Sequence, residues 1–180
     1  MSVTRLFQAL DFAAEKHRAQ RRKCGESVPY INHPIHVARL IAEVGGVEDE
    51  DVLMAAVLHD TLEDTATTRE ELEAAFGPFV LGLVEEVTDD KSLPKAERKR
   101  LQIAHAGELT REATLIKLAD KIANVGDLSH APPADWSPER IREYIEWAEQ
   151  VVRNCKQVNA ALETRFAEVA KEARKALSRT

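Results

Sequence analysis

The sequence predicts an all-α fold, and three observations support that prediction. Apolar residues recur at helical spacing along most of the chain, and no stretch alternates apolar and polar residues as a half-buried strand does. Proline and glycine stand between these periodic stretches, where helices start and stop. No repeat or low-complexity segment interrupts the pattern. We therefore expect one domain over residues 1–180, built from about seven to nine helices.

The N-terminal region predicts two helices separated by a loop. The first spans residues 3–23, where apolar residues share one face and Gly25 can end the helix. His17 continues that apolar face, so we expect a histidine of the core rather than a ligand. The second helix is expected to begin at Pro34, with His33 in the cap position, and to stop at the next pair of glycines.

The middle of the chain predicts a buried helix and several shorter ones. Residues 52–58 are all apolar, so this stretch is expected inside the protein. Thr68 and Glu71 have the spacing of a capping box, which predicts the start of a short helix. Pro78 favours the start of the next helix, and Pro94 that of a charged one.

The C-terminal half predicts longer helices. Residues 113–125 are largely apolar, with charged or amide side chains at Lys117, Asp120, Lys121 and Asn124, and Pro132-Pro133 marks the loop behind them. Ser137-Pro138 is a helix start, and apolar residues recur at helical spacing from there almost to the end of the chain. We expect residues 138–178 to form one long helix or a pair of helices.

Composition and charge exclude several classes of protein. A net charge of −6 argues against general nucleic-acid binding. The longest uninterrupted apolar run is seven residues, too short for a membrane span, and the N-terminus lacks a signal-peptide pattern. Cys24 and Cys155 have neither a CxxC nor a Cys/His neighbour, so free thiols in a reducing cytosol are expected. We thus expect a cytoplasmic protein without a nucleic-acid or membrane partner, and a homo-oligomer remains open.

The stretch from His59 to Asp64 carries the strongest chemical signal. It places an imidazole and three carboxylates directly after the buried apolar run. Burying an unpaired carboxylate is costly, so such groups are normally paired or bound to a metal ion. If the helix continues, Glu63 lies one turn beyond His59 and Asp64 one turn beyond Asp60. His59 and Asp60 can therefore bind a metal ion, with the later carboxylates poised over a metal-bound water, although the pair alone also fits a solvated helix end.

Two further residues can complete a metal site. Asp120 sits on an apolar helix, where a lone carboxylate is hard to leave unpaired. With His33, His59 and Asp60, it would give a metal ion two imidazoles and two carboxylates from three segments. Such a mixed set of nitrogen and oxygen ligands suits Mn²⁺, Fe²⁺ or Zn²⁺. One such ion per chain would lower the pKa of a bound water and offset developing phosphoryl charge.

These motifs resemble those of a known family. His33, His59-Asp60 and Asp120 form the H…HD…D signature of the HD-domain phosphohydrolases. Within that superfamily, YINHP, HDTLED, EEVTDD and KLADKIAN are similar to the hydrolase half of the RelA/SpoT alarmone enzymes. EEVTDDKSLPKAERKRLQ and EYIEWAEQVV resemble the small stand-alone hydrolases, the type called the metazoan SpoT homologue in animals. The resemblance covers roughly residues 3–160 and implies a single HD-domain helical bundle with a buried metal site.

The resemblance also implies roles for individual residues. The family's metal ligands, with manganese as the usual activator, correspond to His33, His59, Asp60 and Asp120. Glu63 and Asp64 match the catalytic acid pair, which positions and deprotonates the attacking water. Arg22 and Lys23 match basic residues that hold the purine end of the nucleotide, and Asn124 matches a ribose contact.

Other residues of the site are less closely defined by the resemblance. Lys95 and Arg98 could steer phosphates, although a solvated charged face explains them equally well. Tyr144 and Trp147 have the spacing to floor a base pocket, with core packing as the favoured role of both. His36 departs from the small or apolar residue expected there, and it could perturb the choice of metal or have no role.

The activity implied is hydrolysis of guanosine tetra- or pentaphosphate at the 3′ position, which gives GDP or GTP and pyrophosphate. An acidic protein needs a local positive rim to bind this small-molecule polyanion, and Arg21–Lys23 with Lys95–Arg100 could supply it. Two alternatives remain open. The same residues could remove the 2′-phosphate of NADPH or act on a broader range of nucleotides. A module without catalysis could instead bind the alarmone or a partner helix.

Overall fold

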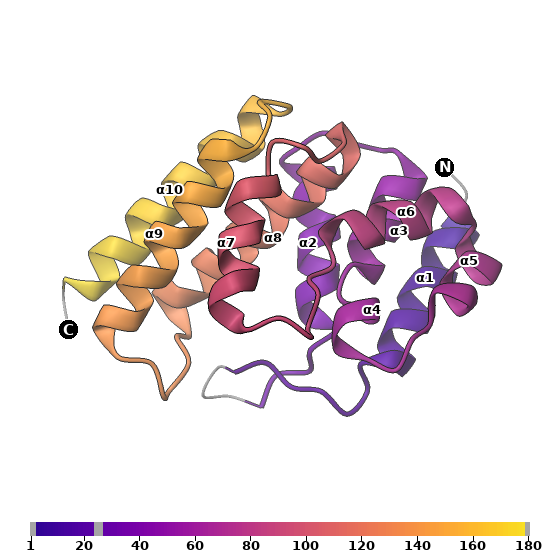
Figure 1. The fold of residues 1–180 in the computed structure, drawn as a ribbon, viewed down its shortest axis with the longest axis horizontal. Coiled ribbons are helices and arrows are strands. Elements are labelled where there is room, and N and C mark those ends of the chain that lie inside the picture. Colours follow the sequence, from indigo (N-terminus) through magenta and orange to yellow (C-terminus); the bar gives the residue numbers. More distant parts are fainter. Residues whose placement is uncertain (1–2, 24–26, 179–180) are drawn as a thin grey trace.

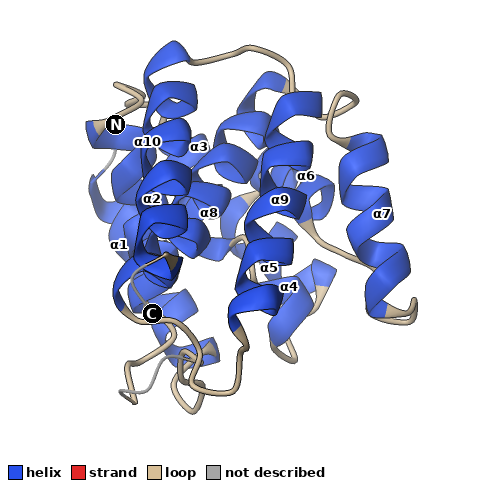
Figure 2. Cartoon of the chain, turned by 90° about the vertical axis from the view of Figure 1, so that its left-hand side faces the viewer, coloured by secondary structure: helices blue, strands red, loops and turns tan. Residues whose placement is uncertain are grey.

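The computed structural model describes residues 3–23 and 27–178. Within these residues all regular secondary structure is helical, as Figure 2 shows, so the all-α prediction is confirmed. The described helices number ten, above the expected range, because the predicted helix around His59 is divided into two. Cys155 is a buried free cysteine, whereas Cys24 and Gly25 lie outside the described residues.

The helices follow one another through the chain with short connections. In order they are α1 (Val3–Lys16), α2 (Asn32–Glu43), α3 (Glu50–Leu58), α4 (Thr61–Asp64), α5 (Arg69–Phe76), α6 (Pro78–Val87), α7 (Lys95–His105), α8 (Arg111–His130), α9 (Pro138–Asn154) and α10 (Ala160–Leu177). None of the described helices is long and apolar enough to cross a membrane.

Helix α8 lies at the centre of the bundle. It packs against α2, α3, α6, α9 and α10, and most of its side chains are buried. Figure 1 shows α9 and α10 on one side of the bundle, with α1 and α5 on the other. Helix α3 is buried along almost its whole length, as its uninterrupted apolar sequence predicts. Lys117 and Lys121, which α8 carries, are therefore held inside the protein.

The first helix is shorter than predicted, because after its fourth turn the backbone forms hydrogen bonds with another segment of the chain. Helix α1 ends at Lys16 instead of Lys23. The backbone N–H of Arg22 donates to the carbonyl of Val28 at 2.9 Å, so this segment pairs with the chain that returns toward α2. His17 lies just beyond the helix end and is only 1% exposed, which confirms the expected core position.

Helix α2 begins before Pro34 rather than at it. Ile31 precedes the helix and already has helical backbone angles, so His33 lies inside the first turn and not in the predicted cap position. The backbone N–H of His33 donates to the carbonyl of Tyr30 at 2.9 Å. This turn places the buried imidazole on the inner face of α2.

The predicted capping box at α5 is confirmed. The Thr68 hydroxyl accepts the backbone N–H of Glu71 at 3.2 Å, and the Glu71 carboxylate accepts the backbone N–H of Thr68 at 3.0 Å. The helix ends at Gly77, whose φ of 87° favours glycine, and Pro78 then opens α6. Sequence signals based on such local bonds therefore located these helix boundaries well.

The helix that carries the HD pair does not continue through it. Helix α3 ends at Leu58, and the four-residue α4 starts at Thr61, so His59 and Asp60 form the junction between them. The backbone N–H of Asp64 still donates to the carbonyl of Asp60 at 2.8 Å. The predicted one-turn spacing is thus kept across the junction, and both ends of this segment face the interior.

Replacing Thr68 tests the capping box. Thr68→Ala removes the hydroxyl that satisfies a backbone N–H at the start of α5, so we expect the free energy of unfolding to fall by about 1 kcal/mol. Thr68→Ser keeps a hydroxyl and should retain most of that stability. Chemical denaturation of both variants measures the difference, and equal stability of the two would contradict the assignment.

Candidate metal centre

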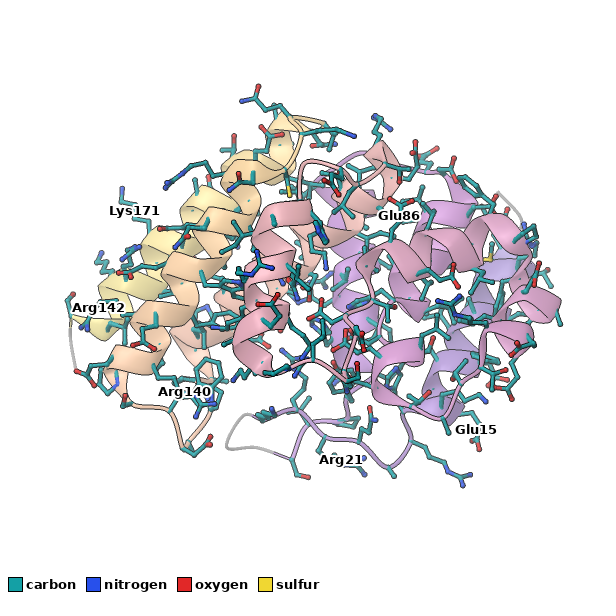
Figure 3. The ribbon with its side chains drawn as sticks, viewed as in Figure 1. Glu15, Arg21, Glu86, Arg140, Arg142 and Lys171 are labelled. Atoms are coloured by element: carbon teal, nitrogen blue, oxygen red, sulfur yellow. The ribbon has the colours of Figure 1, made fainter. Side chains whose placement is uncertain are left out.

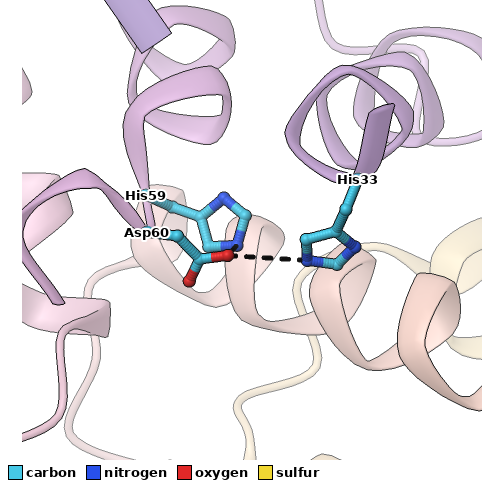
Figure 4. A group of neighbouring side chains, drawn as sticks. All are labelled: His33, His59 and Asp60. Carbon is cyan, nitrogen blue, oxygen red and sulfur yellow. Dashed lines mark ion pairs between the residues drawn. The ribbon is translucent and has the colours of Figure 1, made fainter. Parts of the chain in front are cut away.

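Two imidazoles and two carboxylates meet at the centre of the bundle. The Nε2 atom of His33 lies 3.2 Å from Oδ1 of Asp120 and 3.7 Å from Oδ2 of Asp60. The Nε2 atom of His59 lies 3.1 Å from Oδ2 of Asp60 and 3.9 Å from Oδ1 of Asp120. Figure 4 shows the two rings converging on the Asp60 carboxylate from α2 and from the α3–α4 junction. All four side chains predicted as ligands are therefore brought together.

The bonding of His59 suits a cation at this point. Its Nδ1 atom lies 2.7 Å from the carbonyl of Ala56, so the ring donates its proton there. The opposite nitrogen, Nε2, is buried and has no hydrogen-bond partner within the described chain, although it lies 3.1 Å from Oδ2 of Asp60. A buried ring nitrogen without a hydrogen-bond partner beside two carboxylates is placed as a metal ligand, because a bound cation would displace its proton.

The electrostatics of the cluster favour positive charge. Burial alone would lower the pKa of His59, but the adjacent Asp60 carboxylate outweighs it and raises that pKa to about 9. Burial would raise the pKa of Asp60, but attraction to His59 outweighs it and lowers the pKa. The pKa of His33 is lowered by its burial, which favours the neutral imidazole that a metal ion requires. A divalent cation can supply the charge that the carboxylates attract.

Neighbouring side chains hold the two carboxylates in place. Asp120 accepts hydrogen bonds from Lys121 Nζ at 3.0 Å and from Asn124 Nδ2 at 2.5 Å. The hydroxyl of Tyr30 donates to Oδ2 of Asp60 at 2.7 Å. Sequence reasoning assigned no role to Tyr30 or Lys121, although both belong to the quoted YINHP and KLADKIAN motifs. Their contacts orient the possible ligands from outside the cluster.

The two predicted catalytic acids lie beside the cluster in different surroundings. Glu63 accepts the backbone N–H of Asp89 at 3.0 Å, and its other oxygen lies 3.6 Å from Arg98 Nη1. Burial raises the pKa of Glu63. Asp64 forms an ion pair with Lys91 and accepts a hydrogen bond from the hydroxyl of Tyr30 at 3.3 Å. The raised pKa of Glu63 suits a proton acceptor, whereas Asp64 is tethered by Lys91 and Tyr30.

Two connected cavities give access to this centre. The inner cavity, of about 300 Å³, contains the four possible ligands and both acids. The outer cavity, of about 410 Å³, opens beside it. The residues that line both cavities are Lys23, Tyr30, Asp64, Asn124 and Tyr144. A ligand can therefore extend from the outer cavity to the buried cluster.

The outer cavity is rich in positive charge. Its cationic lining residues are Arg21, Arg22, Lys23, Lys95, Lys99 and Arg140. Figure 3 labels Arg21 and Arg140, which lie along the same edge of the bundle but come from segments far apart in sequence. Because Arg21–Lys23 and Lys95 surround one cavity, the two basic clusters recognised in the sequence do meet in space. This local charge contrasts with the net charge of −6.

The residues predicted to contact the substrate differ in whether they line the outer cavity. Arg22, Lys23, Asn124, Lys95 and Tyr144 all line the outer cavity. Arg98 does not line this cavity, and its guanidinium group instead lies near the acid Glu63. His36 is half-buried and lines neither the inner nor the outer cavity.

Aromatic side chains form one wall of the outer cavity. Tyr144 lines both cavities, whereas Trp147 is buried and its Nε1–H donates to the carbonyl of Lys99 at 3.0 Å. Trp136 lines the outer cavity, and its ring centroid lies 5.4 Å from that of Tyr144. Arg140 lies over the Trp136 ring, 4.5 Å from its centroid. Trp136 was not identified from the sequence, because this residue lies in an irregular loop where helical periodicity gives no signal.

Comparison with known proteins places the chain in a family. Residues 9–145 match the family described as "HD domain". The chain is 55% identical over 161 residues to the human guanosine-3′,5′-bis(diphosphate) 3′-pyrophosphohydrolase MESH1, covering 89% of this chain and 90% of the relative. The Danio rerio MESH1 is 53% identical over 165 residues, covering 92% of each chain.

A solved structure agrees with the sequence comparisons. It is described as a metazoan orthologue of SpoT that hydrolyses ppGpp, and it matches with a TM-score of 0.92 at 47% identity. The match covers 96% of this chain and 97% of that one. The family resemblance read from the sequence motifs is therefore confirmed. The chain belongs to the HD-domain family and, within it, to the family of these MESH1 proteins.

Proposed function

We propose that the protein hydrolyses guanosine tetra- or pentaphosphate at the 3′ position, giving GDP or GTP and pyrophosphate. The observation that carries this proposal is the opening of a cation-lined cavity onto a buried His/Asp cluster. Such a pair of cavities suits a polyanionic nucleotide whose phosphate must reach a metal centre. The activity named for the MESH1 relatives supports the same choice of substrate.

The proposed metal ligands are the four side chains of the central cluster, His33, His59, Asp60 and Asp120. One ion per chain is proposed, with Mn²⁺ favoured because a mixed set of nitrogen and oxygen ligands suits Mn²⁺, Fe²⁺ or Zn²⁺. When bound, such an ion lowers the pKa of a water molecule and offsets the charge that develops on the phosphoryl group. The free Nε2 of His59 supports this assignment.

The outer cavity is proposed to hold the nucleoside part of the substrate. Arg22 and Lys23 would contact the purine end, and Asn124 would contact the ribose where the two cavities join. Tyr144 and the cations around it offer a stacking surface and compensation for the 5′-phosphates. This placement brings the 3′-phosphates into the inner cavity.

The proton of the attacking water is proposed to pass to Glu63. Its raised pKa makes its carboxylate the better base, while Asp64 is held by Tyr30 and Lys91 and orients the water. The water oxygen forms a bond to the phosphorus atom nearest the ribose, and the bond from that phosphorus to the 3′-oxygen breaks. The departing 3′-oxygen gains a proton, and pyrophosphate is released.

A first prediction concerns the base. Glu63→Gln removes the proton acceptor but keeps the shape of the side chain, so kcat should fall on the order of 10²–10⁴-fold. Glu73→Gln, at an exposed position of α5, is the matched control and should leave kcat unchanged. Steady-state kinetics with saturating Mn²⁺ measures both, and a Glu63→Gln variant with wild-type kcat would contradict the assignment.

A second prediction concerns the metal ion. Treatment with a chelator should abolish turnover, and added Mn²⁺ should restore it. Asp120→Asn weakens the charge of one proposed ligand, so elemental analysis should find less than the one bound ion per chain expected of the wild type. Full activity after complete metal removal, or unchanged metal content in Asp120→Asn, would disprove this site.

A substrate panel tests the proposed function itself. Guanosine tetraphosphate, guanosine pentaphosphate and NADPH are incubated in parallel with the Mn²⁺-loaded protein, and the released phosphate species is identified. We expect pyrophosphate from the guanosine substrates at the highest kcat/KM. Preferential release of phosphate from NADPH would replace the proposal with a 2′-phosphatase, and tight binding without turnover would indicate a binding module.

A further inference from the structure

A third cavity lies behind the centre. This rear cavity has a volume of about 360 Å³ and shares four lining residues with the inner cavity, namely Val87, Asp89, Gln102 and Lys117. It shares no lining residue with the outer cavity. The three cavities therefore follow one another in the order outer, inner and rear, with the His/Asp cluster in the middle one.

Lys117 is a buried cation on the wall between the inner and rear cavities. It is 8% exposed, and its Nζ donates to the carbonyl of Val87 at 3.1 Å. An ammonium group has three N–H donors, so two remain for another acceptor. Among the described residues no carboxylate forms an ion pair with Lys117, whereas Lys121 one turn later is paired with Asp120.

The surroundings of Lys117 leave its charge uncompensated. Burial lowers the pKa of Lys117, and the neighbouring Lys121 lowers it further, while the carboxylates of Asp120, Asp89 and Glu63 only partly oppose this. A buried charge without an ion-pair partner opposes folding, so an anion bound beside Lys117 would stabilise its charged form. A bound phosphate would supply both the negative charge and the missing acceptors.

A second unused donor lies on the same side. The Nε atom of Arg98 is buried without a hydrogen-bond partner in the described chain, and Arg98 lines the rear cavity. The rear cavity is also lined by the carboxylates Glu86, Asp89 and Asp90, and Arg98 Nη1 lies 3.6 Å from Glu63 and 4.0 Å from Asp89. Lys117 is therefore the lining cation whose charge is left for a bound anion.

We propose that Lys117 binds the distal phosphate of the substrate's 3′-pyrophosphate group. This inference rests on the proposed function. With the nucleoside in the outer cavity and the first 3′-phosphate at the His/Asp cluster, the second phosphate points away from the nucleoside and toward the rear cavity. A nucleotide with a single phosphate on its ribose has no group that reaches this position. Lys117 thus selects for a pyrophosphate group over a monophosphate.

The variant Lys117→Met tests this assignment, because it removes the charge and retains a buried side chain of similar length. The kcat/KM for guanosine tetraphosphate should fall about 10- to 100-fold, as expected for the loss of hydrogen bonds to a charged group. The inhibition constant of added pyrophosphate should rise by a similar factor. The inhibition constant of orthophosphate and the kcat/KM for any measurable NADPH hydrolysis should change less than about threefold.

Controls separate this role from a structural one. Lys156 also donates to a backbone carbonyl, that of Leu109 at 2.7 Å, but it lines none of the three cavities, so Lys156→Met should leave all these constants unchanged. Thermal melting should show that Lys117→Met is at least as stable as the wild type, because an unpaired buried charge has been removed.

Two results would overturn the inference: unchanged pyrophosphate inhibition, or equal losses for pyrophosphate and orthophosphate. A wild-type protein that fails to hydrolyse guanosine tetraphosphate would instead refute the proposed function. Direct titration of pyrophosphate into the Mn²⁺-loaded wild type and the Lys117→Met variant would still decide the role of Lys117.

Discussion

Asp60 and Asp120 are two carboxylates enclosed by apolar helices, and the architecture of the bundle depends on how their charge is compensated. Removing such charges from water opposes folding by several kcal/mol unless partners replace the lost hydration. The hydroxyl of Tyr30, the ammonium of Lys121 and the imidazole rings supply part of that replacement. The cluster is complete only when α2, the α3–α4 junction and α8 are packed together, so the charge compensation depends on that packing. The proposed divalent cation would complete the balance, so the same residues would serve stability and chemistry.

In the proposed function, the cavities around this cluster would divide the recognition of a nucleotide among different kinds of side chain. The outer cavity combines arginine and lysine side chains with the rings of Trp136 and Tyr144, which suits a flat base that carries phosphates. The inner cavity concentrates carboxylates and imidazoles, which suit a metal ion and a water molecule. On the rear side, Lys117 offers the positive charge that a leaving pyrophosphate requires. Positively charged and negatively charged cavity linings thus lie next to one another inside a protein whose net charge is −6.

The sequence predicted the features that rest on local spacing and missed those that rest on long-range contacts. Proline, glycine and the capping box located most helix starts, because these signals act within one turn. The predicted end of α1 was wrong, since the backbone after His17 turns back and pairs with residues 28–30 instead of continuing the helix. Asp60 and Asp120 could be named in advance because a buried acid on an apolar helix is conspicuous, and the H…HD…D signature added His33 and His59. Three other features depend on the assembled bundle and leave no trace in the periodicity of the sequence. They are the hydrogen bonds of the Tyr30 hydroxyl, the lack of an ion-pair partner for Lys117, and the cavity wall formed by Trp136.

The central claim is that one divalent cation is held between the four side chains of the buried cluster. Its most direct test is a crystal of the protein grown with Mn²⁺ and measured for anomalous scattering from manganese. The account predicts one strong peak per chain, bounded by His33, His59, Asp60 and Asp120. An empty cluster, or a peak coordinated by other residues, would contradict it.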